Sequence, residues 1–499
     1  MTKILDAINQ FVWGIPALIL ILLVGILLSV RTGWAQIRLF PCAIRSFFAP
    51  FHKKENLSGV SPYRALCTAL AATVGTGNLA GVAGAIAIGG PGAVFWMWIS
   101  ALLGMATKFA EATLAVRYRT TDSSGNYVGG PMHIVQQGLG AKWKPLAYIY
   151  CFLGVVAAFG VGSATQVNAV LGGVNGAVKA LGGRESEIRD IVIGIVLAIF
   201  SVLILLSGAR RICATAAFLV PFASVFYILL CVGVLLMKLS VIDDALSAIV
   251  KGAFCPEAVT GGVLGSAFQA LRVGTSRGVF TNEAGMGTAG IAHGSAQVDH
   301  PVQQGLMGIF EVFLDTIVIC TMTALVILCS GISIPYGHDE GVQITADAFS
   351  RVYGNWVNIP LAIALCCFAV ATIIGWGLYG ARCAQFLFGD KSWRYFAVFQ
   401  AASVILGAVL STGTVWSISE TSNGLMAIPN LIILICLCPE IVRLTKEYEF
   451  GRKSAGGGTN ENINQCKSMR TLSYAEVSSS GSKSQGGRKG NLPSKYRST

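Results

Sequence analysis

The sequence predicts an all-α polytopic membrane protein with about eleven transmembrane helices, and three observations support this fold class. Of the 499 residues, 54% are hydrophobic and only 12% are charged, against about 25% charged in soluble domains. Apolar runs near 20 residues recur along the chain, and each is long enough to cross a bilayer. Loops rich in Lys and Arg alternate with loops that are poor in them, so successive runs should cross in opposite directions.

The first apolar run sets the orientation of the rest. It is followed by a basic loop that includes Arg31, Arg38 and Arg45, so this loop should face the cytoplasm and the N-terminus should lie outside. Alternation then places the C-terminus inside. The expected spans are Ile15–Val30, Ala65–Ile88, Ala93–Val116, Leu146–Leu171, Ile191–Leu206, Ala214–Met237, Gly262–Ile291, Gln304–Ser330, Ile359–Phe386, Tyr395–Leu410 and Ile418–Leu437.

The end of the chain differs in composition from the spans. From Gly451 to Thr499 it holds nine Lys or Arg and two Glu, which supplies seven of the net +12 charges. Gly, Ser, Asn and Gln dominate the remainder, so this segment cannot bury enough apolar surface to offset the ordering entropy. We expect residues 450–499 to be a disordered cytoplasmic tail, and we do not interpret the positive charge as a nucleic-acid footprint.

The second span carries the main functional signal. No charged residue lies between Arg64 and Lys108, yet the middle of this run, Thr73–Asn78, is poor in helix formers. Gly75 and Gly77 each cost about 1 kcal/mol against Ala in a helix. A broken span survives in hydrocarbon only if its freed backbone groups find polar partners. We therefore predict a discontinuous helix with a binding site near the bilayer midplane; close helix packing at the glycines is the alternative explanation.

A similar pattern returns five spans later. Val74–Thr76 reads Val-Gly-Thr, and Val273–Thr275 repeats those three residues in the seventh span. An odd number of spans per repeat forces the second copy to lie upside down. Paired interruptions in two halves of a chain point to a transporter site between inverted repeats. We thus expect an extra helix and basic loop (1–64), two inverted repeats (65–240 and 258–440) and a second helix interruption at Val273–Gly278.

An amino acid needs donors for its carboxylate and acceptors for its ammonium group, and a broken helix offers both. The backbone N–H groups around Gly75, Thr76, Gly77 and Asn78 should face the carboxylate. Matching polar backbone should come from the seventh span. The residues expected there are Gly274, Thr275 and Ser276.

Two long motifs resemble those of the alanine-or-glycine:cation symporter family. They are ALAATVGTGNLAGVAGAIAIGGPGAVFWMW with KFAEATLAVRYR after it, and QALRVGTSRGVFTNEAGMGTAG. The likeness covers about residues 10–450. It implies a leucine-transporter-type 5+5 inverted repeat preceded by one extra helix, in a bacterial inner membrane. It also implies sodium-driven uptake of alanine or glycine, with D-alanine included in some members, and no enzymatic activity.

The resemblance also implies ligands for the coupling ion, Na⁺. By similarity these are the carbonyls of Ala71, Val74 and Ala369 and the hydroxyl of Thr372, while a second sodium site would use Thr73 and Asn78. Thr372 and Trp376 are equivalent to residues that line the substrate pocket in the family. Without the resemblance, we would interpret Trp376 as an ordinary packed or interfacial side chain.

Ionisable side chains inside spans are costly and usually functional. Two pairings are suggested by the sequence, Lys108 with Glu111 and Arg277 with Asp315, either as gating pairs or as fixed structural ones. The segment Asn282–Gly287 should line the inner vestibule. The full set of such ionisable side chains is Lys108, Glu111, Arg277, Glu283, Glu311 and Asp315.

Other functions remain open at this point. A proton-coupled carrier using Asp315 or Glu283 is the alternative within transport, and uptake abolished by an uncoupler but insensitive to sodium would favour it. A channel would need a continuous ring of like groups along a pore, and an enzyme would need a catalytic motif; the sequence shows neither. Besides substrate and lipid, no obligate protein partner is evident.

Overall fold

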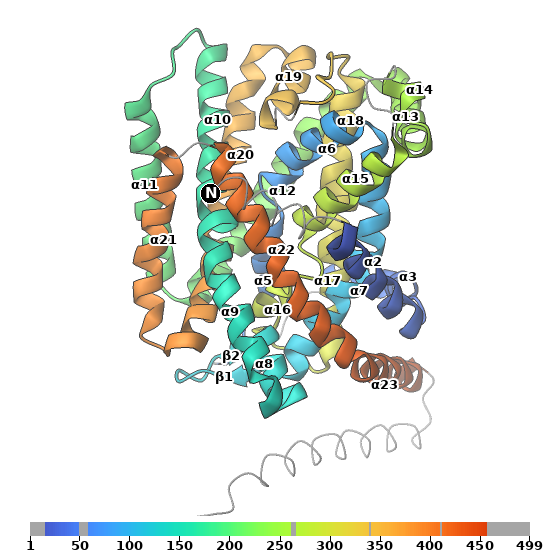
Figure 1. Cartoon of the computed structure of the whole chain (residues 1–499), viewed down its shortest axis with the longest axis vertical. Helices are drawn as coiled ribbons and strands as arrows, with labels where there is room; N and C mark the ends of the chain where they lie inside the picture. Colours follow the sequence, from blue (N-terminus) through green and yellow to red (C-terminus); the bar gives the residue numbers. More distant parts are fainter. Residues whose placement is uncertain (1–14, 49–57, 261–265, 339–340, 410–411, 457–499) are drawn as a thin grey trace, which may run out of the picture. The chain divides into compact units, whose positions relative to one another are not determined.

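The computed structural model describes residues 15–48, 58–260, 266–338, 341–409 and 412–456. Most residues in this part of the chain are helical, and a small antiparallel hairpin is formed by β1 (Thr120–Thr121) and β2 (Tyr127–Val128) (Figure 1). One compact unit extends to Val442 and a second begins at Arg443. The following paragraphs concern the first unit.

The chain up to residue 260 already contains most of the long helices. Its helices are α2 (Ile15–Arg31), α3 (Ala35–Arg38), α4 (Phe40–Phe48), α5 (Pro62–Thr73), α6 (Val82–Gly89), α7 (Gly92–Arg117), α8 (Pro131–Ile134), α9 (Lys144–Phe159), α10 (Thr165–Ala180), α11 (Glu187–Leu206), α12 (Ala209–Met237), α13 (Ile242–Phe254) and α14 (Glu257–Thr260). Short π or 3-10 turns extend or join them: η1 (Gly77–Gly81), η2 (Val135–Leu139), η3 (Ala141–Trp143), η4 (Gly160–Ala164) and η5 (Leu239–Val241).

The described part of the chain after residue 265 also consists mainly of long helices with short irregular turns. It comprises α15 (Ala267–Asn282), α16 (Thr288–His293), α17 (Pro301–Val312), η6 (Phe313–Cys320), α18 (Thr321–Cys329), α19 (Val342–Tyr353), η7 (Asn355–Val357), α20 (Asn358–Phe388), α21 (Ser392–Val409), α22 (Thr412–Cys436) and α23 (Cys438–Gly456). Residues 450–456, which the sequence analysis assigned to the tail, belong to α23, and residues 457–499 lie outside the described part.

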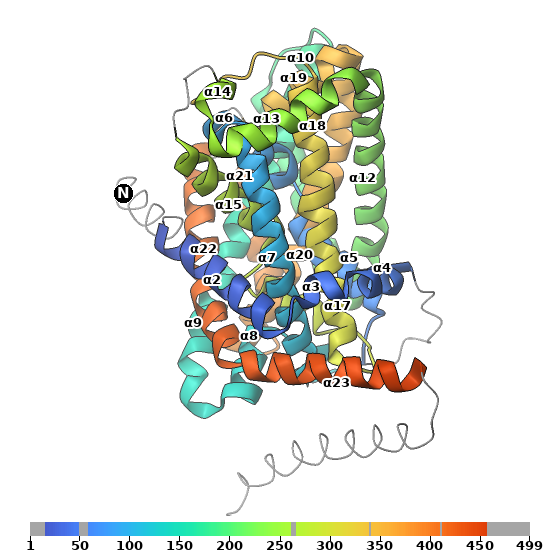
Figure 2. The same ribbon diagram turned by 90° about the vertical axis from the view of Figure 1, so that its right-hand side faces the viewer.

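Each predicted span coincides with one of these helices or helix pairs. By length and composition, six described helices can cross a membrane singly, and up to eight can if each bent pair counts as one span. The number eleven stays a prediction. Several helices, among them α3, α4, α13 and α19, lie outside the predicted spans, because none is long enough to cross a bilayer. In Figure 2, α13 lies across the ends of α7 and α18.

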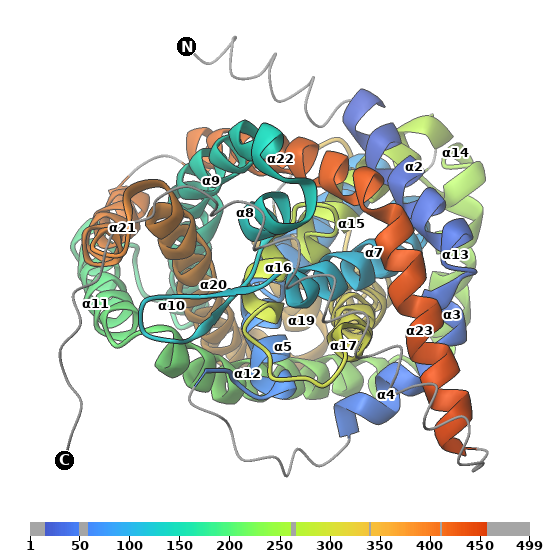
Figure 3. The ribbon, with the colours of Figure 1, turned by 90° about the horizontal axis from the view of Figure 1, so that it is seen from below.

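The two interrupted helices lie inside the bundle and are surrounded by other helices. α5 packs on α12, α20 and α16, while α15 packs on α7, which also contacts α17. Seen from below, α5, α7, α16 and α17 occupy the middle and α11 with α21 the edge (Figure 3). α11 and α21 expose large apolar side chains, including Leu203 at 65% and Val398 at 62%. Such surfaces suit lipid, since water would penalise them.

Candidate functional site

The first interrupted helix is broken at the residues that the sequence predicts. Ser61 caps α5 by accepting the Arg64 N–H, and the helix ends at Thr73 with Val74 in an extended conformation. A π-helical turn, Gly77–Gly81, then leads into α6. The two halves are bent by 53°. The predicted discontinuity at Thr73–Asn78 is confirmed.

Asn78 fills the gap that this break leaves in the backbone ladder. Its Oδ1 accepts the Gly75 N–H at 2.8 Å, so that N–H is turned away from the carbonyl of Ala71. Its Nδ2 donates to Asp315 Oδ1 at 2.7 Å and to the Asp315 carbonyl at 3.2 Å. A buried amide with these partners stabilises the break, because each freed backbone group in hydrocarbon would otherwise cost several kcal/mol.

Asp315 joins the first break to the second interrupted helix. It lies in the π-helical segment η6 between α17 and α18, an irregularity often found at functional sites. Thr316 Oγ1 donates to Asp315 Oδ2 at 2.7 Å, and Asn282 Nδ2 at the end of α15 donates to Thr316 Oγ1 at 3.1 Å. The suggested pairing of Arg277 with Asp315 stays a prediction; the donors found at the Asp315 carboxylate are Asn78 and Thr316.

Thr372 lies opposite the first break with its hydroxyl unused. It is 1% exposed, and within the described part of the chain its Oγ1 has no hydrogen-bond partner. A Cβ placed on Gly75 would lie 2.7 Å from this oxygen, and one on Gly375 would lie 3.3 Å from the Ala71 carbonyl carbon. The two glycines therefore let α20 approach the broken end of α5. The structure thus places the predicted site residues Ala71, Gly75 and Thr372 close together. Thr372 lies one turn beyond Ala369 on α20.

Gln166 is a residue of this site that the sequence analysis missed. Thr76 Oγ1 donates to Gln166 Oε1 at 3.1 Å, and Gln166 Nε2 donates to the Val161 carbonyl at 3.0 Å. This glutamine follows the π-helical turn Gly160–Ala164, which interrupts the fourth expected span. The sequence offers one indication of this role: Gln166 is an uncharged polar residue that follows a glycine-rich stretch within an apolar run.

The second break is ten residues away from its predicted place. α15 runs as a regular helix through Val273–Gly278, so the predicted interruption there is wrong. The chain leaves the helix at Glu283, with φ 54°, followed by Gly285 at 97° and Gly287 at 77°. The Val-Gly-Thr repeat does not mark a helix break here, because Gly274 allows α15 to pack closely on α7. A Cβ added at Gly274 would lie 2.1 Å from the Ala93 carbonyl oxygen of α7.

Replacing Gly274 with alanine should destabilise the fold by about 1–3 kcal/mol through overpacking against α7, without altering the apparent affinity for transported solute. Gly176→Ala in α10, where an added Cβ meets no atom within 4 Å, is the matched control and should be neutral or stabilising. Melting temperature in detergent and uptake assays separate the two effects. A large change in apparent affinity with unchanged stability would contradict the packing role and restore Gly274, Thr275 and Ser276 as substrate contacts.

Glu283 occupies the second break itself, and a role for Asn282–Gly287 in the inner vestibule stays a prediction. Trp376 Nε1 donates to its Oε1 at 2.9 Å, and Thr288 Oγ1 donates to its Oε2 at 2.7 Å. Both Glu283 and Trp376 are buried, at 2% and 0% exposure. Trp376 also contacts Gly162 closely, because a Cβ there would lie 2.3 Å from Trp376 Cβ. The indole is thus fixed in place between α9–α10 and the second break.

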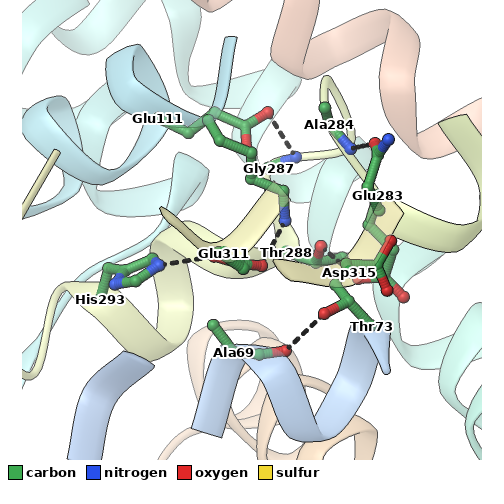
Figure 4. A network of polar contacts seen from close by, with 12 residues as sticks. Ala69, Thr73, Glu111, Glu283, Ala284, Gly287, Thr288, His293, Glu311 and Asp315 are labelled. Atoms are coloured by element: carbon green, nitrogen blue, oxygen red, sulfur yellow. Dashed lines mark hydrogen bonds and ion pairs between the residues drawn. The ribbon is translucent and has the colours of Figure 1, made fainter. Parts of the chain in front are cut away.

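Two further carboxylates support α16 from α7 and α17 (Figure 4). Glu111 Oε1 accepts the N–H groups of Gly285 at 2.9 Å and Gly287 at 3.1 Å. Lys108 Nζ binds Glu311 Oε1 at 2.9 Å, so the predicted pairing of Lys108 with Glu111 is wrong. Glu311 Oε2 also contacts His293 Nε2 at 2.8 Å. On α7, positions 108 and 111 are close enough to pair, but the long Lys side chain reaches the neighbouring helix instead.

A cavity of about 850 Å³ opens at the end of the bundle that carries the β hairpin. It reaches Ile291 of α16 and Leu378 of α20, and Arg382 Nη1 binds Asp122 Oδ2 at its wall, 3.1 Å away. Burial raises the pKa of Asp122, but the Asn126 N–H and the Arg382 guanidinium more than offset it and hold that pKa below its ordinary value. This ion pair therefore persists at neutral pH.

The bent α5–α6 pair and the interrupted α15–α16 pair are features of a leucine-transporter-type fold. The solved structure of MhsT in complex with L-phenylalanine shares this fold, with a TM-score of 0.55 and 16% identity over 77% of this chain and 90% of that one. The predicted fold class is confirmed.

The chain belongs to the sodium:alanine symporter family, whose sequence model matches residues 1–462. It is 40% identical over 456 residues to the sodium/alanine symporter AgcS of Methanococcus maripaludis, covering 91% of this chain and 98% of the relative. It is 36% identical to the amino-acid carrier protein AlsT of Bacillus subtilis, covering 89% and 91%. The family and these relatives are transporters rather than enzymes, which confirms the resemblance seen in the sequence.

Proposed function

We propose that this protein imports alanine or glycine together with sodium ions by alternating access across a bacterial inner membrane. The observation that carries the proposal is the buried, unpartnered Thr372 hydroxyl beside the broken end of α5. A hard cation such as Na⁺ prefers oxygen ligands. Thr372 Oγ1 with the carbonyls of Ala71, Val74 and Ala369 would provide such a set.

The amino acid would bind at the start of the second half-helix. The first N–H groups of a helix lack intrahelical partners and attract negative charge. In the broken span these groups lie at Thr76 and Gly77, since the Asn78 N–H already donates to the Gly75 carbonyl at 3.2 Å. Trp376, fixed by Gly162 and Glu283, would limit the side chain to a methyl group or a hydrogen. Gln166 and Asn78 would orient the polar backbone.

Alternating access would open the site toward one face at a time. Thr76, Asn78, Thr372 and Trp376 are all at most 1% exposed, so this conformation closes the site to both faces. The cavity beside α16 and α20 stops at Ile291 and Leu378, and we assign it as the inner vestibule. The predicted second sodium site at Thr73 and Asn78 remains a prediction; the Thr73 hydroxyl donates to the Ala69 carbonyl at 3.3 Å.

Uptake by purified protein in proteoliposomes tests the coupling. Alanine and glycine should accumulate with an inward sodium gradient and should not when choline replaces sodium. Uptake that is unchanged in choline would reject sodium coupling, and uptake abolished by an uncoupler but insensitive to sodium would favour the proton-coupled alternative through Asp315 or Glu283.

Thr372→Ala should raise the sodium concentration needed for half-maximal uptake by about tenfold or more, because a lost ligand to a charged group is worth roughly 1.5–3 kcal/mol. Thr372→Ser keeps the hydroxyl and is the matched control, with a sodium dependence near that of the wild type. An unaltered sodium dependence in Thr372→Ala would remove this residue from the ligand set.

A further inference from the structure

Glu111 and Asn430 share one hydrogen bond and leave one oxygen each without a donor. Asn430 Nδ2 donates to Glu111 Oε1 at 2.7 Å and to the Gly285 carbonyl at 2.9 Å, which fixes the orientation of the amide. Glu111 Oε2 and Asn430 Oδ1 have no hydrogen-bond partner in the described part of the chain. Both side chains are 1% exposed. Two acceptor oxygens on one bonded pair therefore lie in the interior without a donor.

An added proton resolves this arrangement with the fewest changes. An ionised carboxylate only accepts hydrogen bonds, whereas a carboxylic acid also donates one. A carboxylic acid and a carboxamide are complementary, since the amide N–H donates to the acid carbonyl and the acid O–H to the amide carbonyl. The first of these two bonds is present between Asn430 and Glu111, and the two unused oxygens are the atoms that the second bond requires.

A sodium ion fits the same position less well. Three donors, from Gly285, Gly287 and Asn430, already point at Glu111 Oε1, and their positive ends would repel a cation. Hard cations also need several oxygen ligands, whereas the Glu111–Asn430 pair offers two unpartnered oxygens in the described part of the chain. The Gly285 carbonyl is occupied by Asn430 Nδ2.

The charged groups that face Glu111 are Lys108 on its own helix and Glu311 of α17, and the hydroxyls of Tyr150 and Tyr379 approach from α9 and α20. Lys108 is bound to Glu311. The positive charge of Lys108 is therefore already paired, and burial disfavours the charged form of a carboxyl group.

We propose that Glu111 and Asn430 form a proton-binding site under the second break, in which protonated Glu111 donates its Oε2–H to Asn430 Oδ1. In the binding step, one proton from water converts the carboxylate to a carboxylic acid, and no other covalent bond changes. The bound proton holds Gly285 and Gly287 in the conformation described here. Its release leaves a buried negative charge that favours opening of the α16 side toward water. This site is separate from the sodium ligands and does not rest on the proposed substrate.

Infrared spectroscopy of the purified protein tests the proposal without a transport assay. At neutral pH the wild type should show the carbonyl-stretch band of a protonated carboxyl group, and this band should be lost in Glu111→Gln. Glutamine keeps both an acceptor and a donor, so that variant should fold. Glu283→Gln is the matched control and should retain the band. Absence of the band in the wild type, or its persistence in Glu111→Gln, would overturn the proposal.

A second variant tests the hydrogen bond between Glu111 and Asn430 directly, and a second measurement tests whether the site binds sodium instead of a proton. Asn430→Leu removes the partner of Oε2–H, so the band should shift to higher frequency rather than disappear; an unshifted band would contradict the pairing. Wild type and Glu111→Gln should bind the same number of sodium ions in equilibrium ²²Na⁺ binding. A loss of one bound sodium ion in Glu111→Gln would show that the site takes a metal cation and would overturn the proton assignment.

Discussion

Replacing Lys108 with methionine is expected to destabilise the protein by about 3–5 kcal/mol, because removing one partner of a buried ion pair leaves an uncompensated charge. Lys108 and Glu311 are both 0% exposed and 2.9 Å apart, so neither group can regain water. Glu311→Gln should be damaging for the same reason, since it leaves the ammonium group of Lys108 unpaired. The measurement is the melting midpoint in detergent at fixed pH.

The double variant distinguishes the ion pair from simple packing. Lys108→Met with Glu311→Gln removes both charges, so it should be more stable than either single variant. Lys179 and Glu185, which are 2.7 Å apart and 65% and 57% exposed, provide the surface control: Lys179→Met should leave the melting midpoint nearly unchanged. Additive losses in the double variant would show that Lys108 and Glu311 contribute independently.

Asn78→Asp is expected to lower uptake by about two to three orders of magnitude. Asn78 Nδ2 lies 2.7 Å from Asp315 Oδ1, so the variant replaces a donor with a second carboxylate oxygen. Two like charges about 4 Å apart repel by about 4 kcal/mol at an effective dielectric constant of 20, and every 1.4 kcal/mol is tenfold. Initial uptake rates in proteoliposomes at matched protein content provide the measurement.

The reciprocal exchange is the decisive control for this pair. Asn78→Asp combined with Asp315→Asn restores one amide and one carboxylate at the same contact, with donor and acceptor reversed. It should recover most of the lost uptake, whereas Asp315→Asn alone should be milder than Asn78→Asp because it creates no repulsion. If the exchange fails while the protein remains folded, then Asp315 has a role beyond holding Asn78.

The sequence was most informative where local chemistry decides the structure. Glycines beside Thr76 and Asn78 in a span without charges predicted the first break, because Gly disfavours helix and the Thr and Asn side chains compete for backbone hydrogen bonds. The second break could not be located in the same way. Gly274 and Gly278 are the same residue type as Gly285 and Gly287, but the former pair meets α7 and the latter pair adopts positive φ. Only tertiary contacts separate these two uses of glycine.

Sequence spacing also could not predict which side chains on different helices form ion pairs and hydrogen bonds with one another. Lys108 and Glu111 are three residues apart and share a helix face, yet Lys108 binds Glu311 and Glu111 binds the backbone of the second break. Gln166 carried a weak signal, as a polar residue after Gly160 and Gly162. Thr372 was placed by family resemblance alone, and its environment next to Gly75 became visible only with the fold.

The hydrogen-bonded series from Asn78 through Asp315 and Thr316 to Asn282 has a thermodynamic consequence. Because it ties both interrupted helices to one π-helical segment, we expect a solute bound at the first break to change the conformational energy of the second. Linkage of this kind is reciprocal: the factor by which the bound solute favours one conformation of the second break must equal the factor by which that conformation tightens binding of the solute.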